Sequence, residues 1–172
     1  MMRAAVLAIA ALAFAAPARG ATSLGHVTEN EQIALAGDTA LFERHDSDGA
    51  IVLEVPLDAS ARAQSRLQVQ SEGFNDPVLT LSGSAQRAGI TVVSASEVAE
   101  PRYSGHAFSG PPAGPWPELP SSDTAFVPVA VKVDADNLFV VEASDEAERV
   151  TVREAGGVET ELVSASYAGA SQ

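Results

Sequence analysis

Short runs of β-branched and apolar residues that alternate in polarity constrain this chain more than any other feature. The clearest run covers residues 126–133, where valine occupies every second position from Val127 to Val133. Alternate side chains of a β-strand point to the same face of its sheet. The run therefore predicts a strand with one apolar face.

Similar runs recur along the chain between residues that favour turns. Residues 51–57 place Ile51, Leu53, Val55 and Leu57 on one face, and the turn-forming residues 45–49 can join this run to a partner strand at 38–44. Further runs lie at 65–70, 78–81, 90–94, 138–142, 149–154 and 158–163. Two segments, 59–64 and 95–100, have the composition of a single helical turn, which is too short to cover a sheet.

This spacing predicts the fold class. About nine or ten short strands separated by turns are typical of an antiparallel sandwich or barrel. We therefore expect an all-β fold, an antiparallel β-sandwich of the immunoglobulin-like kind. Because 172 residues suit one hydrophobic core, a single domain is the first expectation. Two small β subdomains are the alternative.

The alternative depends on residues 104–123, which contain five prolines and three glycines. Such a composition predicts a long loop or linker between β-rich segments at 21–103 and 124–166. Within it, Trp116 and Phe108 are the candidate partner-binding residues, since aromatic anchors carry much of the energy at interfaces. For Trp116 itself we favour a position folded back into its own domain, as is usual for a large aromatic residue, over contact with a partner.

The first 20 residues have the pattern of a secretory signal peptide. Arg3 precedes an uncharged apolar run at 4–16, and small residues follow that allow cleavage after Ala18 or Gly20. The run is shorter than the roughly 20 residues that cross a bilayer. We expect an exported protein, periplasmic or extracellular, without a transmembrane anchor in the mature chain and with a flexible tail at 167–172.

Charge and cysteine content exclude several functional classes. The chain has 10 Lys and Arg against 23 Asp and Glu, and cleavage of the signal peptide changes the net charge from −13 to −15. A chain this acidic is unsuited to nucleic acid or to an anionic membrane surface. Without cysteine it forms no disulfide, thiolate nucleophile or cysteine-ligated metal centre.

Acidic residues concentrate near the C-terminus, with nine acids against two arginines between residues 134 and 161. In the run 149–154 we expect Val150 and Val152 to point inward. The intervening residues, Arg149, Thr151 and Arg153, are then expected to face water. Cross-strand pairs between these arginines and Glu159 or Glu161 follow, and they protect a sheet edge rather than perform catalysis.

No compact catalytic motif is found. A serine hydrolase needs a nucleophile, a base and an orienting acid, but the chain has no G-x-S-x-G motif. His106 lies between Ser104 and Ser109 and is the candidate base of the enzymatic alternative. The three histidines, His26, His45 and His106, lack the spacing of a zinc motif. We predict no catalytic residues.

Two acidic loops are weak calcium candidates. Asp46 with Asp48, and Asp134 with Asp136, place oxygen ligands at alternate positions. Neither loop continues as an EF-hand, and a plain turn between strands is the first expectation. We therefore predict no cofactor, with calcium as a weak alternative.

These observations predict an exported, non-enzymatic binding, accessory or interaction module. Its partner is expected to be a protein or glycan of the cell envelope or extracellular space. A self-assembling or fibre-associated surface component is the first alternative, since valine-rich strands can pair at their edges. A hydrolase or metal-dependent enzyme is the second.

Overall fold

Eleven β-strands and no helix make up the described part of the chain, which confirms the all-β prediction. The computed structural model describes residues 32–47, 49–58, 61–70, 77–95, 103–120, 123–154 and 158–166. The predicted signal peptide and tail lie outside these ranges, as do most of 95–100 and residues 59–60. Among the described residues, no helix has the length and hydropathy needed to span a bilayer.

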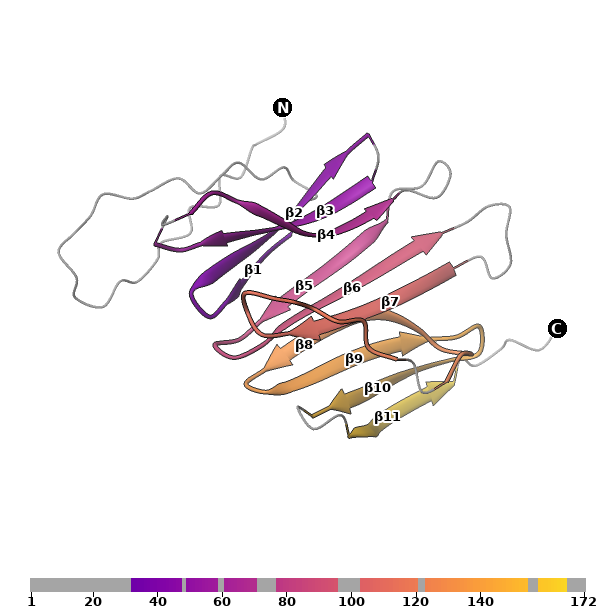
Figure 1. Cartoon of the computed structure of the whole chain (residues 1–172). Coiled ribbons are helices and arrows are strands. Elements are labelled where there is room, and N and C mark those ends of the chain that lie inside the picture. The colour runs from indigo at the N-terminus through magenta and orange to yellow at the C-terminus, as the bar shows by residue number, and fades with distance from the viewer. Residues whose placement is uncertain are drawn as a thin grey trace, which may run out of the picture.

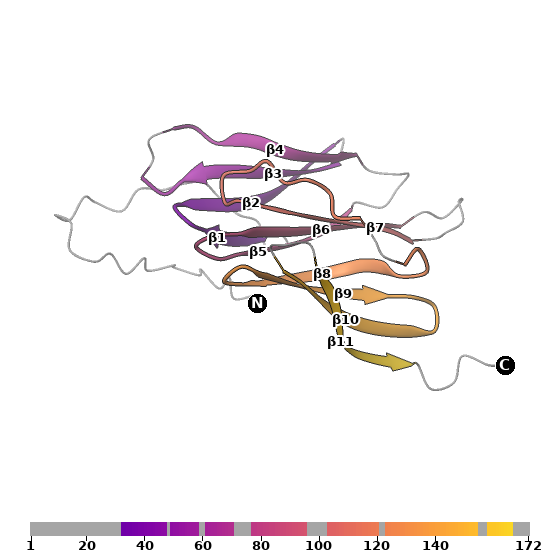
Figure 2. The ribbon, with the colours of Figure 1, turned by 60° about the horizontal axis from the view of Figure 1, so that its bottom comes forward.

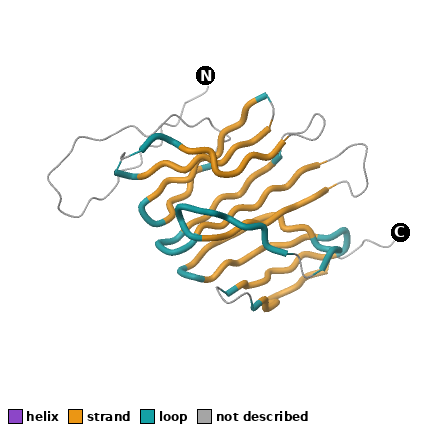
Figure 3. The backbone as a smooth tube through the Cα atoms, in the orientation of Figure 1, coloured by secondary structure: helices purple, strands orange, loops and turns teal. Residues whose placement is uncertain are grey.

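The strands form three antiparallel sheets, each built from consecutive strands (Figures 1 and 3). The N-terminal sheet contains β1 (Ile33–Ala36), β2 (Thr39–Asp46), β3 (Gly49–Pro56) and β4 (Gln64–Gln70). The middle sheet contains β5 (Val78–Gly83), β6 (Ala88–Ala95) and β7 (Tyr103–Gly110). The C-terminal sheet contains β8 (Val127–Asp134), β9 (Asn137–Ala143), β10 (Ala147–Arg153) and β11 (Glu159–Ser166).

The middle sheet lies between the other two (Figure 2), and the first five residues of its central strand β6 are buried on both faces. Toward the N-terminal sheet it contributes Leu79, Ile90 and Val92 to an apolar core. Toward the C-terminal sheet, β6 carries Gly89, where an added Cβ would lie 2.6 Å from Leu138 Cδ1. The absence of a side chain there lets the two sheets approach closely. A smaller core fills this second interface, formed by Val131, Val133, Leu138 and Val140.

Both edges of the middle sheet are closed by other segments. On the β5 edge, the side-chain amide of Gln32 donates to Leu79 O (2.8 Å) and accepts from the Leu81 amide (3.0 Å), as a neighbouring strand would. On the β7 edge, the backbone amide of Ser109 donates to Pro117 O, and the backbone amide of Leu119 donates to Ala107 O. Unpaired strand edges invite association with other chains, and among the described strands β1, β4, β8 and β11 are the edge strands of the outer sheets.

The predicted loop at 104–123 is wrong over its first seven residues. Residues Tyr103–Gly110 form β7, which pairs with β6 along its whole length. Glycine and serine are compatible with an antiparallel ladder, and the prolines that prevent one begin only at Pro111. After Gly110 the chain folds back over its own domain, and the Trp116 indole N–H donates to Pro111 O (2.9 Å).

The strands contain the predicted alternation, but the assignment of faces needs correction. On β3 the side chains in the first core are Ala50 and Val52, whereas Ile51 and Leu53 are half-buried on the outer face. On β8 a register shift between Pro128 and Ala130 interrupts the single valine face.

The prediction for β10 is reversed. Arg149, Thr151 and Arg153 share the inner face with Leu138 and Val140 of β9, because these residues lie opposite one another in the ladder. Thr151 and Arg153 are buried and Arg149 is nearly so, whereas Val150 and Val152 are half-buried on the outer face.

Candidate binding cleft

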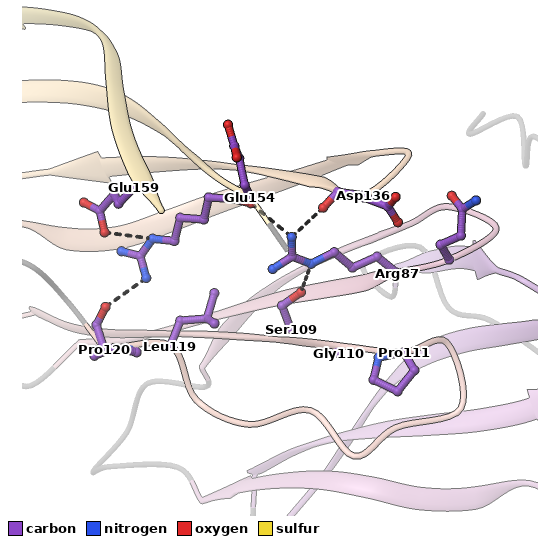
Figure 4. A pocket seen from close by; sticks show the side chains of 11 residues that line it. Arg87, Ser109, Gly110, Pro111, Leu119, Pro120, Asp136, Glu154 and Glu159 are labelled. Atoms are coloured by element: carbon purple, nitrogen blue, oxygen red, sulfur yellow. Dashed lines mark hydrogen bonds and ion pairs between the residues drawn. The ribbon is translucent and has the colours of Figure 1, made fainter. Parts of the chain in front are cut away.

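A cleft of about 450 Å³ opens between the middle and C-terminal sheets (Figure 4). The β5–β6 turn, β7, the β7–β8 loop, the β8–β9 turn and the end of β10 all reach it. No aromatic side chain lines it. The lining residues are Gln86, Arg87, Ser109, Gly110, Pro111, Leu119, Pro120, Asp136, Arg153, Glu154 and Glu159.

The β5–β6 turn positions Arg87 at the cleft. The Ser84 hydroxyl accepts from the amides of Gln86 (3.2 Å) and Arg87 (3.1 Å) and so closes the turn. The same hydroxyl donates to Ala135 O (2.6 Å) in the β8–β9 turn. Ser84 therefore fixes both the turn that carries Arg87 and its distance from the C-terminal sheet.

The guanidinium of Arg87 bridges three elements. Its Nε donates to Ser109 Oγ (2.7 Å) on β7, and its Nη1 donates to Asp136 O (2.6 Å) and Arg153 O (3.0 Å). All three acceptors are neutral. Burial lowers the pKa of Arg87, and the nearby Asp136 carboxylate offsets part of that effect. Arg87 is thus a cation to which no described carboxylate is hydrogen-bonded.

The third nitrogen of this guanidinium, Nη2, is open to the cleft. In Figure 4 it carries no dashed line and points along the cleft toward Leu119. Nη2 makes no hydrogen bond to a described residue and is not fully buried, so solvent reaches it. The geometry leaves one arm of a fixed guanidinium fork for a ligand.

Arg153 also lines the cleft, and carboxylates neutralise its charge. Its Nη2 lies 3.2 Å from Glu142 Oε1, its Nε lies 3.2 Å from Glu159 Oε2, and its Nη1 donates to Pro120 O (2.9 Å). The predicted cross-strand pairing of Arg153 with Glu159 is confirmed, on the inner face rather than the outer one. Arg153 holds the β7–β8 loop against the sheet.

Glu142 on β9 is the centre of this charged cluster and has no solvent exposure. It also accepts from Arg149 Nε (2.8 Å), and the Thr151 hydroxyl lies at 3.5 Å. The Arg149 guanidinium stacks over Phe126 at 4.1 Å from the ring centroid. Two arginines around one carboxylate satisfy a charge that is costly to bury alone.

The rim of the cleft is acidic. Asp136 and Glu154 are exposed, and Glu159 is half-buried against Arg153. The Glu154 carboxylate makes no ion pair or hydrogen bond with any described residue. The lining of the cleft therefore carries both the cationic Arg87 and the carboxylates of Asp136, Glu154 and Glu159.

The predicted partner-binding residues lie outside the cleft. Trp116 is only 9% exposed and packs in the first apolar core, and Phe108 is half-buried against the same cluster. The structure thus places Trp116 in the fold-back position that we favoured. Contact of either residue with a partner stays a prediction.

The candidate base His106 has an acidic neighbour that sequence reasoning missed. Its Nδ1 lies 2.6 Å from Glu118 Oε1, and both side chains are about half exposed. Neither Ser104 nor Ser109 is hydrogen-bonded to the ring, and the Ser109 hydroxyl donates instead to Ala88 O (2.8 Å). The described residues therefore place a carboxylate beside His106 but no nucleophile.

The calcium candidates are described only in part. Asp48 and the side chain of Asp46 lie outside the described residues. In the β8–β9 turn, the backbone carbonyls of Ala135 and Asp136 accept from Ser84 and Arg87. Over the described ranges, no group of three or more His, Asp or Glu side chains is arranged to hold a metal ion.

Arg87 itself was not predicted as a site residue. The sequence feature that could have pointed to Arg87 is its place in a turn of small residues between the apolar runs 78–81 and 90–94, in a chain with only 10 Lys and Arg. The chain matches no protein-family model, and no curated protein is detectably similar to it. The cleft geometry is therefore the basis for a functional proposal.

Proposed function

We propose that this protein is an exported, non-enzymatic binding module and that the cleft at Arg87 binds its ligand. One observation carries the proposal: Arg87 is fixed by three neutral acceptors and keeps one nitrogen open to the cleft. A guanidinium held this way is preorganised for an oxygen ligand. The volume of about 450 Å³ lies within the range of small-molecule sites.

Binding is favoured over catalysis because the cleft lacks an activated nucleophile. Two described histidines contact a carboxylate, His45 with Glu43 on β2 and His106 with Glu118. None of these four residues lines the cleft. A small ligand also fits the cleft better than a glycan, since sugar rings usually stack on aromatic side chains and none lines it. The all-β fold with three antiparallel sheets supports a binding scaffold of this kind, and its immunoglobulin-like character stays a prediction.

Nuclear magnetic resonance tests the proposal. Purified ¹⁵N-labelled protein is titrated with a panel of amino acids, carboxylates, sugars and inorganic phosphate. We expect at least one compound to shift the amide signals of Gln86, Arg87 and Asp136 saturably, and Arg87→Gln to abolish the shifts. Lys132→Gln, on an exposed position of β8, is the matched control that retains them.

Two results would count against this function. Shifts confined to residues outside the cleft would place binding elsewhere. Turnover of a compound that depends on His106, measured with His106→Ala, would favour the enzymatic alternative instead.

Self-assembly is the second candidate function, and β11 favours it. This edge strand exposes Leu162 (54%) and Val163 (57%), and its outer edge has no partner strand among the described residues. Exposed edges of this kind can accept a strand from another copy. Light scattering across a concentration series tests it, because a strict monomer at high concentration contradicts assembly.

A further inference from the structure

We propose that the ligand of the cleft is a small zwitterion, with a carboxylate bound by Arg87 and an ammonium group beside the acidic rim. A free amino acid with a cationic side chain, or a short basic peptide, has this chemistry. The inference rests on the proposed function and adds the ligand class. Three properties of the cleft support it.

The first property is the open arm of Arg87. Its Nε and Nη1 are occupied by Ser109, Asp136 O and Arg153 O, so Nη2 is the donor left for a ligand. A partly desolvated guanidinium without a hydrogen-bonded carboxylate favours an anionic oxygen ligand. Such a ligand supplies the counter-charge that no described side chain supplies by hydrogen bonding.

The second property is the negative rim. Asp136 and Glu154 present exposed carboxylates at the mouth, and Glu154 has no described partner. These groups repel a multiply charged anion such as phosphate and attract an ammonium group. Arg87 conversely repels a simple diamine. Only a ligand that carries both charges is complementary to Arg87 and to the carboxylates of Asp136 and Glu154 together.

The third property is the apolar part of the lining, which lies on the side of Arg87 away from Asp136 and Glu154 (Figure 4). Leu119 and Pro111 supply short apolar surfaces, and the lining contains no aromatic ring. Nucleobases and sugars usually depend on aromatic stacking, whereas the methylene chain of an amino acid needs only apolar contact. The cleft therefore suits an aliphatic zwitterion.

Isothermal titration calorimetry tests the ligand class with four probes. L-lysine carries both charges, cadaverine lacks the carboxylate, hexanoate lacks the amines, and inorganic phosphate is a multiply charged anion. We expect L-lysine to bind about tenfold or more tightly than each of the other three, since each lost charge-assisted contact costs about one order of magnitude.

Two variants separate the two ends of the ligand. Arg87→Gln is expected to reduce lysine affinity to that of cadaverine. The double variant Asp136→Asn/Glu154→Gln is expected to reduce it about tenfold while hexanoate affinity stays the same or rises. Both rim side chains are exposed, so this variant remains informative even if Arg87→Gln destabilises the fold. Lys132→Gln is again the control.

The outcomes distinguish this inference from the function on which it rests. Tighter binding of phosphate than of lysine, or equal binding of cadaverine and lysine, overturns the zwitterion. If other compounds of the panel shift the cleft signals and lysine does not, the ligand class is wrong and the proposed function stands. If no compound shifts them, both fail.

Discussion

The two interfaces of the middle sheet are built on different principles. Toward the N-terminal sheet, the contact is a dry core of apolar side chains such as Leu41, Val52 and Ile90. Toward the C-terminal sheet, the apolar core is smaller and continues into a buried cluster centred on Glu142. The first interface is mainly apolar, with Gln32 hydrogen-bonded to β5 at its edge, whereas the second depends more on charged groups with specific partners.

This difference explains why the cleft opens at the second interface. Apolar side chains fill space without regard to direction, so the first interface closes. Guanidinium groups must instead reach particular oxygens, as Arg87 reaches three and Arg153 reaches Pro120 O. The directed contacts hold the sheet and the β7–β8 loop in place while leaving space between them.

The largest expected effect is at the charged interface. Glu142→Ala removes the carboxylate shared by Arg149 and Arg153 and leaves two largely buried cations without it. We expect a loss of about 3–5 kcal/mol in the free energy of unfolding. Urea denaturation followed by circular dichroism measures it.

A matched triple variant sharpens this prediction. Glu142→Leu/Arg149→Met/Arg153→Met replaces the fully buried carboxylate and both arginines with apolar groups. We expect it to be far less destabilised than Glu142→Ala, because the only described carboxylates that lose an arginine, Asp123 and Glu159, are partly exposed to water. Equal destabilisation of the two would mean that shape, rather than charge, governs this interface.

The second effect is at the dry interface. Ile90 is fully buried in the first core, and Ile90→Ala leaves a cavity there. We expect a loss of about 2–5 kcal/mol with an unchanged denaturant slope. Val78→Ala, at an exposed apolar position of the same sheet, is the control and should change stability by about 0.5 kcal/mol or less. A comparable loss in both variants would contradict the packing argument.

Sequence alternation predicted the strands well because it reports the period of the backbone directly. The hairpin expected around 45–49 is the β2–β3 hairpin, with Asp46 opposite Gly49. Alternation does not say which face is buried. In β10 the arginines face inward because Glu142, on the neighbouring strand, compensates them, and that pairing is visible only once the register is known.

The cleft was less predictable than the strands because its contacts are remote in sequence. The three acceptors of Arg87 lie 22, 49 and 66 residues away. No local pattern indicates that β7, the β8–β9 turn and the end of β10 converge on one side chain. The burial of Trp116 was easier to expect, because a lone large aromatic residue usually packs in its own domain, and the structure places it in the first core.

The smallest effect concerns two buried threonines that face the second interface. Thr91 lies two residues after Gly89 on the same face of β6, and its Oγ1 is buried without a hydrogen-bond partner. Thr151 is equally buried, but its hydroxyl lies 3.5 Å from Glu142 Oε2. Replacing an unsatisfied hydroxyl by a methyl group removes a desolvation cost, whereas replacing a bonded one removes a contact.

We therefore expect Thr91→Val to be neutral or stabilising by up to about 1 kcal/mol, and Thr151→Val to be destabilising by about 1 kcal/mol. Both substitutions preserve shape and β-branching, so the opposite signs report hydrogen bonding alone. Thermal unfolding of the two variants side by side measures the difference. Destabilisation by Thr91→Val would show that its hydroxyl has a partner in solution, and the second interface would then be more polar than its four-residue apolar core indicates.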